Sequence, residues 1–90
     1  MNNMGDVGIT LKIMPTGTEV DLESLRERVI EAVPDTAKVQ GTDIAPVAFG
    51  LKAVMLDLVT GDESPDELVD MLAGVDGVAR IEIEKIGRLF

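Results

Sequence analysis

The order of two hydrophobic periodicities restricts the fold of this 90-residue chain more than any other feature. Four stretches alternate, or nearly alternate, between apolar and polar residues, as half-buried strands do. Two other stretches place apolar residues three and four positions apart, as amphipathic helices do. We expect strands over residues 5–14, 37–46, 51–59 and 79–84, and helices over residues 22–33 and 65–73. The predicted order is strand, helix, strand, strand, helix, strand.

Capping residues and prolines mark the ends of the predicted helices. Asp21 can cap the first helix, and Pro34 ends it because its ring cannot continue the hydrogen-bond ladder. The second helix begins with a capping box, in which Ser64 is the N-cap, Pro65 takes the first helical position and Glu67 completes the motif. Local signals therefore support both helices independently of their periodicity.

Two strand–helix–strand halves joined by right-handed crossovers predict a ferredoxin-like α+β sandwich. Its four-stranded antiparallel sheet carries both helices on one face, and the stretch over 37–46, broken by Gly41, is expected at an edge. The predicted core consists of Val7, Ile9, Leu11, Ile13, Val54, Leu56, Leu58, Ile81 and Ile83 from the sheet, with Leu25, Val29, Leu68 and Leu72 from the helices. The predicted open face holds Thr10, Lys12, Ala53, Met55, Asp57, Arg80 and Glu82. Residues 5–90 are expected to form this single domain, after a flexible N-terminus of residues 1–4.

Composition removes several classes of function. The chain has neither cysteine nor histidine, which excludes disulfides, thiolate nucleophiles and zinc sites of the Cys/His type. Its net charge of −9 disfavours contact with nucleic acid, and suits a basic protein partner, a salt-rich cytoplasm or simply a solvated surface. We find no signal peptide and no membrane-spanning stretch. We therefore expect a soluble, cytoplasmic monomer without metal or cofactor that binds neither nucleic acid nor membrane.

Paired carboxylates are frequent, but their positions favour structural roles. The pairs are Asp62 with Glu63, Asp66 with Glu67, and Glu82 with Glu84. They belong to the start of a helix, where acidic groups favour the helix dipole, or to the solvated face of a strand. Because no pair has an apolar wall that would raise a pKa, we predict no catalytic residue.

A regulatory domain that binds a small ligand is the alternative that the residues leave open. Domains of this fold often bind ligands through glycine-containing loops, and the stretch "AGVDGVA" over residues 73–79 has two glycines. The same glycines are equally explained by the end of the second helix and the turn after it.

Four stretches resemble, in order, the archaeal translation elongation factor 1-beta family. They are "MGDVGITLKIMP", "EVDLESLRERV", "PVAFGLKAVML" and "VDGVARIEIEKIGRLF", and the most specific part is "IAPVAFGLKA". Proteins of this family are guanine nucleotide exchange factors for elongation factor 1-alpha, the GTPase that delivers aminoacyl-tRNA to the ribosome. The resemblance implies the same partner and function for this chain, with no covalent chemistry of its own.

The resemblance also implies which residues contact the partner. Phe49 of the "AFG" motif would dock on the GTPase, with Gly50 beside it, and Arg88 would reach toward the magnesium and nucleotide site. Eukaryotic relatives carry lysine at that last position. From its charge, and not from the resemblance, Lys52 is expected to be a rim contact that speeds encounter. The fold predicts that Phe49 and Arg88 lie at opposite ends of the sheet, roughly 25–30 Å apart. We expect the backbone to turn at Gly87 and leave Arg88 outside the last strand.

Overall fold

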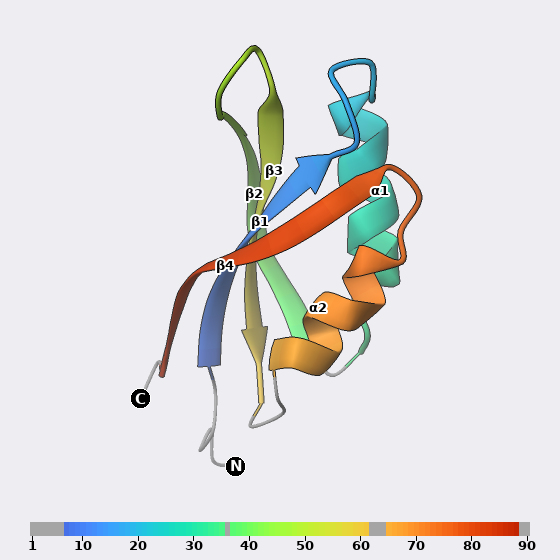
Figure 1. Ribbon diagram of the computed structural model, residues 1–90. Helices are drawn as coiled ribbons and strands as arrows, with labels where there is room; N and C mark the ends of the chain where they lie inside the picture. The colour runs from blue at the N-terminus through green and yellow to red at the C-terminus, as the bar shows by residue number, and fades with distance from the viewer. Residues whose placement is uncertain (1–6, 36, 62–64, 89–90) are drawn as a thin grey trace.

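A computed structural model describes residues 7–35, 37–61 and 65–88 of the chain. All six predicted elements are present in the predicted order (Figure 1). They are β1 (Val7–Pro15), α1 (Leu22–Ala32), β2 (Ala37–Pro46), β3 (Lys52–Thr60), α2 (Pro65–Ala73) and β4 (Val78–Arg88). The flexible N-terminus predicted for residues 1–4, the N-cap predicted at Ser64, and the pair Asp62 and Glu63 lie outside the described residues.

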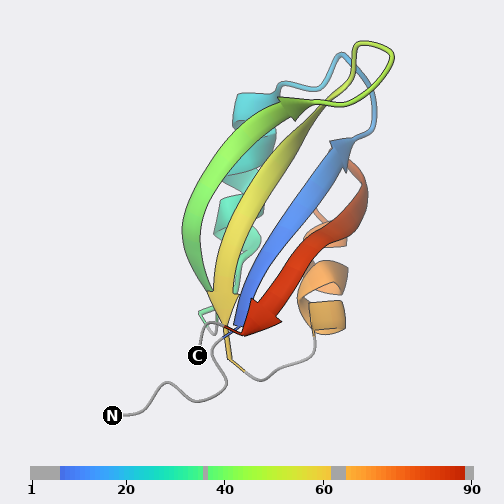
Figure 2. The ribbon, with the colours of Figure 1, turned by 90° about the vertical axis from the view of Figure 1, so that its left-hand side faces the viewer.

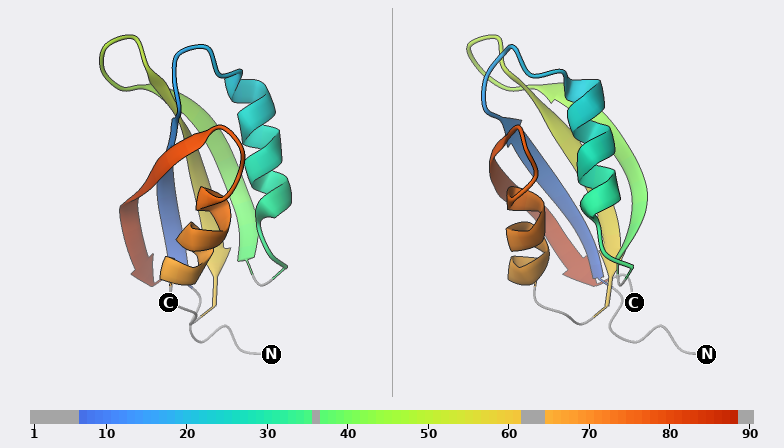
Figure 3. Two further views of the ribbon diagram at one scale, coloured as in Figure 1. Left: turned by 45° about the vertical axis from the view of Figure 1, so that its right-hand side comes forward. Right: turned by 90° about the vertical axis from the view of Figure 1, so that its right-hand side faces the viewer.

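The strands form one antiparallel sheet in the order β2-β3-β1-β4, as the ferredoxin-like fold requires. Both helices lie on one face of this sheet (Figure 3), and Figure 2 looks onto the face that carries no helix. β2 is an edge strand, and its register with β3 shifts between Val39 and Gly41, as the glycine interruption predicted. The fold prediction is confirmed.

The core lies between the sheet and the two helices. Leu11, Leu56 and Leu58 are buried at the centre of the sheet, and Leu25 and Val29 of α1 pack against this layer. The other members of the buried cluster are Ile9, Ile13, Val54, Leu68 and Leu72. Val7 and Ile81 are partly buried against it. The prediction for the core holds for every residue except one.

Ile83 is the exception, because its side chain is 40% exposed. It pairs with Leu11 and so lies on the helix side of the sheet, but β4 is an edge strand. The second half of β4 lies to one side of α2, so this helix does not cover it (Figure 3). The strict alternation predicted for this strand also stops after Ile83. Leu11 pairs with Ile83 and Thr10 pairs with Lys85, so Glu84 is an extra residue in a β-bulge.

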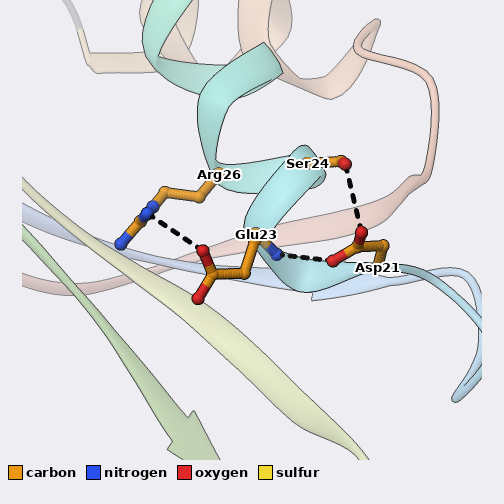
Figure 4. A network of polar contacts seen from close by, with 4 residues as sticks. All are labelled: Asp21, Glu23, Ser24 and Arg26. Atoms are coloured by element: carbon orange, nitrogen blue, oxygen red, sulfur yellow. Dashed lines mark hydrogen bonds and ion pairs between the residues drawn. The ribbon is translucent and has the colours of Figure 1, made fainter.

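The start of α1 has the predicted cap (Figure 4). One carboxylate oxygen of Asp21 accepts a hydrogen bond from the backbone N–H of Glu23 at 3.1 Å, and the other accepts one from Ser24 Oγ at 3.2 Å. The first of these bonds satisfies a backbone donor that the first turn of a helix leaves free. Asp21 therefore determines where α1 begins, and so where the β1–α1 connection ends.

The face without helices is mostly polar, as predicted, but Ala53 of the predicted open face is fully buried. Thr10 Oγ1 donates a hydrogen bond to Asp57 Oδ1 at 2.7 Å, between β1 and β3. Arg80 and Glu82 form an ion pair at 2.7 Å on β4. These polar groups of the open face are therefore paired with one another across and along the strands.

Candidate partner-binding surface

The turn between β2 and β3 has an uncommon backbone conformation. Leu51 N–H donates to the carbonyl oxygen of Ala48 at 2.9 Å, and Val47 N–H donates to the carbonyl oxygen of Leu51 at 2.8 Å. The two central residues, Phe49 and Gly50, have φ angles of 55° and 80°. Two positive φ angles in succession define a type I′ turn, whose twist suits a tight hairpin.

Phe49 is a poor residue for this position from the point of view of folding. Left-handed backbone is normal for glycine and tolerated by asparagine, but it is an outlier for a bulky side chain. Phe49 gains nothing in return, because its side chain is 99% exposed. A strained and fully exposed aromatic residue at the tip of a hairpin is therefore explained by binding better than by folding.

Gly50 and Lys52 flank this ring. Gly50 supplies the second left-handed position of the turn, and an added Cβ would meet no atom within 4 Å. Glycine is therefore required at position 50 for its backbone conformation, and not because a side chain would lack space. Lys52 is exposed and begins β3. The structure therefore brings three of the four predicted site residues together at one end of the sheet.

Arg88, the fourth predicted site residue, is the last residue of β4 and lies at the other end of the sheet. Val7 pairs with Arg88 on one side and with Thr60 on the other, so Arg88 is level with the end of β3. β3 runs from Lys52 to Thr60, which is about 26 Å at the usual rise of ~3.3 Å per residue. Because Phe49 lies beyond Lys52, the two positions lie about as far apart as predicted.

The turn predicted at Gly87 is wrong. Gly87 pairs with Gly8 and β4 continues to Arg88, so the strand holds the backbone of both residues. The apolar alternation stops earlier because the bulge at Glu84 shifts the pattern by one residue, after which pairing with β1 resumes. A pattern based on strict alternation could not follow the strand past this point.

Sequence analysis missed a groove of about 460 Å³ next to the hairpin. It lies between the first turn of α1 and the ends of β2 and β3, and it borders Gly50. Its lining includes the half-buried Val20, Leu22 and Ile44, and the exposed Asp21, Glu23 and Lys52. No local sequence motif predicts this groove, because its lining residues come from segments that are distant in the sequence and meet only in the folded domain.

The paired carboxylates do not form a site in the described part of the chain. Asp66 and Glu67 are exposed in the first turn of α2, and Glu82 forms its ion pair with Arg80. Among the residues that the structure describes, no group of three or more acidic residues could hold a metal ion. Within the same residues, no helix is both long and apolar enough to cross a membrane.

The glycine loop that supported the ligand-binding alternative is explained by the fold. Gly77 has a φ angle of 97°, and an added Cβ would lie 3.1 Å from Arg28 Nη2 and 3.4 Å from Leu25 Cδ1. Arg28 Nε donates a hydrogen bond to the carbonyl oxygen of Asp76 at 3.2 Å. Thr16 N–H donates to the carbonyl oxygen of Gly77 at 3.0 Å. The loop thus packs tightly against α1 and the β1–α1 connection, and its glycine is required there.

Together, the fold and the strained, exposed ring define a small α+β module with a candidate protein-binding surface at the hairpin end of its sheet. Residues 8–89 match the family described as the EF-1 guanine nucleotide exchange domain, and the chain belongs to this family. The resemblance noted in the sequence is therefore confirmed.

Curated relatives agree with this assignment over nearly their whole length. Elongation factor 1-beta of Methanococcoides burtonii is 42% identical over 87 residues, which cover 94% of this chain and 98% of that protein. The elongation factor 1-beta of Natronomonas pharaonis is 38% identical over 88 residues, covering 96% and 100%. Among solved structures, the C-terminal domain of the MgtC protein from Mycobacterium tuberculosis has a TM-score of 0.64, covering 99% of this chain and 95% of that one. At 14% identity, that likeness shows the fold alone.

Proposed function

We propose that this chain accelerates the release of GDP from elongation factor 1-alpha by contacting the GTPase at both ends of its sheet. The observation that carries this proposal is the conformation of Phe49, which is strained, 99% exposed and placed at the hairpin tip. Family membership supplies the reaction and the partner. The exchange factor works as a cytoplasmic monomer and has no covalent chemistry of its own.

The hairpin end is the anchor in this proposal. Docking would bury the ring of Phe49, and burying a phenylalanine side chain is worth about 1.5–3 kcal/mol. The I′ turn holds the ring away from the domain before the partner arrives, so little ordering is needed on binding. Lys52, exposed at the start of β3, would add a charged contact at the rim.

Arg88 acts at the opposite end, at the nucleotide site of the GTPase. A separation of about 26 Å along β3 is too long for one small active site. It suits a rigid bar that contacts two separate parts of a larger partner. The register of β4 with β1 makes this bar rigid up to Arg88, since Arg88 pairs with Val7 in the sheet.

Exchange then follows from linkage. If the factor binds the nucleotide-free GTPase more tightly than the GDP-bound form, bound factor must weaken GDP binding by the same ratio. A cation brought near the bound magnesium of the GTPase would repel it and compete for its ligands. Magnesium tolerates little distortion of its octahedral shell, so such a disturbance would loosen the nucleotide with it.

The test is a GDP-release assay with the matching elongation factor 1-alpha. The GTPase is loaded with a fluorescent GDP analogue, and release is followed after adding excess unlabelled nucleotide, with and without this chain. We expect the rate to rise with the concentration of the factor and to saturate. A rate that does not depend on the factor would refute the proposal.

Removing the charge of Arg88 should affect release more than binding. We expect Arg88→Ala to slow GDP release about tenfold, a loss comparable to one hydrogen bond to a charged group, with a much smaller loss of affinity for the nucleotide-free GTPase. The difference in release rate between wild type and Arg88→Ala should shrink as free magnesium is lowered. Loss of the metal loosens GDP by itself, which is the effect proposed for the arginine. Lys85→Ala, which removes the same charge from the same strand, is the control and should change the rate little. Release curves for wild type and Arg88→Ala that stay parallel at every magnesium concentration would assign Arg88 to docking alone.

A further inference from the structure

The groove beside the hairpin borders two of the proposed contact residues, Gly50 and Lys52, but the proposed contacts assign it no occupant. Its volume of about 460 Å³ lies between the first turn of α1 and the ends of β2 and β3. Gly50, which follows Phe49 in the turn, is one of its lining residues. Phe49 does not line the groove itself, but a partner surface that buries its ring lies next to Gly50, at the edge of the groove.

The lining is apolar inside and charged outside. Leu22, Ile44 and Val20 are half-buried, and they give the groove an apolar floor. Asp21 and Glu23, both exposed, form its wall on the side of α1, while Lys52 stands on the side of the hairpin. A side chain that fits this order has an apolar stem and a charged end.

The acidic wall determines the sign of that charge. The carboxylate of Asp21 accepts two hydrogen bonds from the first turn of α1, which hold it in place. Glu23 extends toward Arg26 (Figure 4), but its contact of 3.5 Å is long and its side chain is 73% exposed. An exposed pair of this kind is worth little and can exchange partners readily. The chain as a whole carries a charge of −9, which also attracts a basic surface.

We infer that this groove receives a lysine or arginine side chain of elongation factor 1-alpha, with the methylene stem on Leu22 and Ile44 and the charged end beside Asp21 and Glu23. Long basic side chains commonly bury their stems along apolar surface in this way. This inference rests on the proposed function and extends the docking surface from one ring to a ring and an adjacent groove. It also names the chemistry that the partner must present.

Two double variants at the cap and along α1 test the inference. Each removes two negative charges, so the two variants have the same net charge as one another. Asp21→Asn/Glu23→Gln neutralises the groove wall and keeps the helix cap, since asparagine caps as well as aspartate. Glu27→Gln/Glu31→Gln removes the same two charges from exposed positions of the same helix that do not line the groove. Affinity for nucleotide-free elongation factor 1-alpha is measured by titration at low and at moderate salt. Thermal melting checks that both variants are folded.

We expect the groove variant to bind about tenfold more weakly at low salt, in the range seen for close charge pairs at interfaces, and to depend less on salt than wild type. The control variant should lose less than about twofold, through long-range attraction alone. Equal losses in the two variants would overturn the inference. In that case wild type would still accelerate GDP release, whereas failure of the proposed function itself would abolish that acceleration in wild type.

Discussion

Replacing Phe49 with asparagine is expected to stabilise the free domain and to weaken its binding to elongation factor 1-alpha. The two effects have opposite signs because they have separate causes. Asparagine followed by glycine is a preferred pair for a type I′ turn, so Phe49→Asn should relieve about 1 kcal/mol of backbone strain. The same change removes the aromatic ring, which should cost about 2 kcal/mol or more of binding energy.

Phe49→Ala separates the two contributions. Alanine also lacks the ring but keeps a Cβ in left-handed backbone, so it should lose the affinity and recover little of the stability. Urea denaturation of the free domain and titration against the nucleotide-free GTPase are the two measurements. Ala48→Asn is a matched control, because it places asparagine at the neighbouring exposed position and leaves the ring intact. A lower stability for Phe49→Asn would contradict the turn geometry, and an unchanged affinity would contradict the docking role.

Truncating Leu56 should produce the largest loss of stability. Leu56 is fully buried in β3, where it pairs with Leu11 of β1 and Thr42 of β2 and belongs to the layer that faces the helices. Leu56→Ala is therefore expected to cost roughly 2–5 kcal/mol of unfolding free energy, through lost burial and the cavity left behind. The upper part of that range is a large share of the stability of a small domain.

Met55→Ala is the control for this prediction. Met55 is the adjacent residue of the same strand and is only half-buried on the face without helices. Met55→Ala should lose less than half as much unfolding free energy as Leu56→Ala, because the neighbours of Met55 on that face can rearrange and water can fill the space. Urea midpoints and slopes for the two variants provide the comparison. Similar costs would mean that the two faces of the sheet are equally packed, which would contradict the layer described here.

The sequence by itself was sufficient for the elements, their order and most of the core. The reason is that the signals are local and repeated. Alternation in β1 and β3, helical spacing of Leu25 and Val29, and the cap at Asp21 each depend on residues only a few positions apart. Several such signals agree within each element, so one irregular residue changes little. The position of the "AFG" motif in a connection also followed from its place between two predicted strands.

The tertiary structure alone decided the features that depend on distant pairing. The bulge at Glu84 comes from matching β4 to β1 rather than from the alternation of β4, and the exposure of Ile83 comes from its place on an edge strand beyond the cover of α2. The continuation of β4 to Arg88 requires Gly87 to pair with Gly8, at the other end of the chain. The left-handed backbone of Phe49 follows from closing a tight hairpin between two strands whose register is already determined. The groove exists only where α1 meets the ends of β2 and β3. A local pattern carries no information about any of these, because each depends on which distant segment lies alongside.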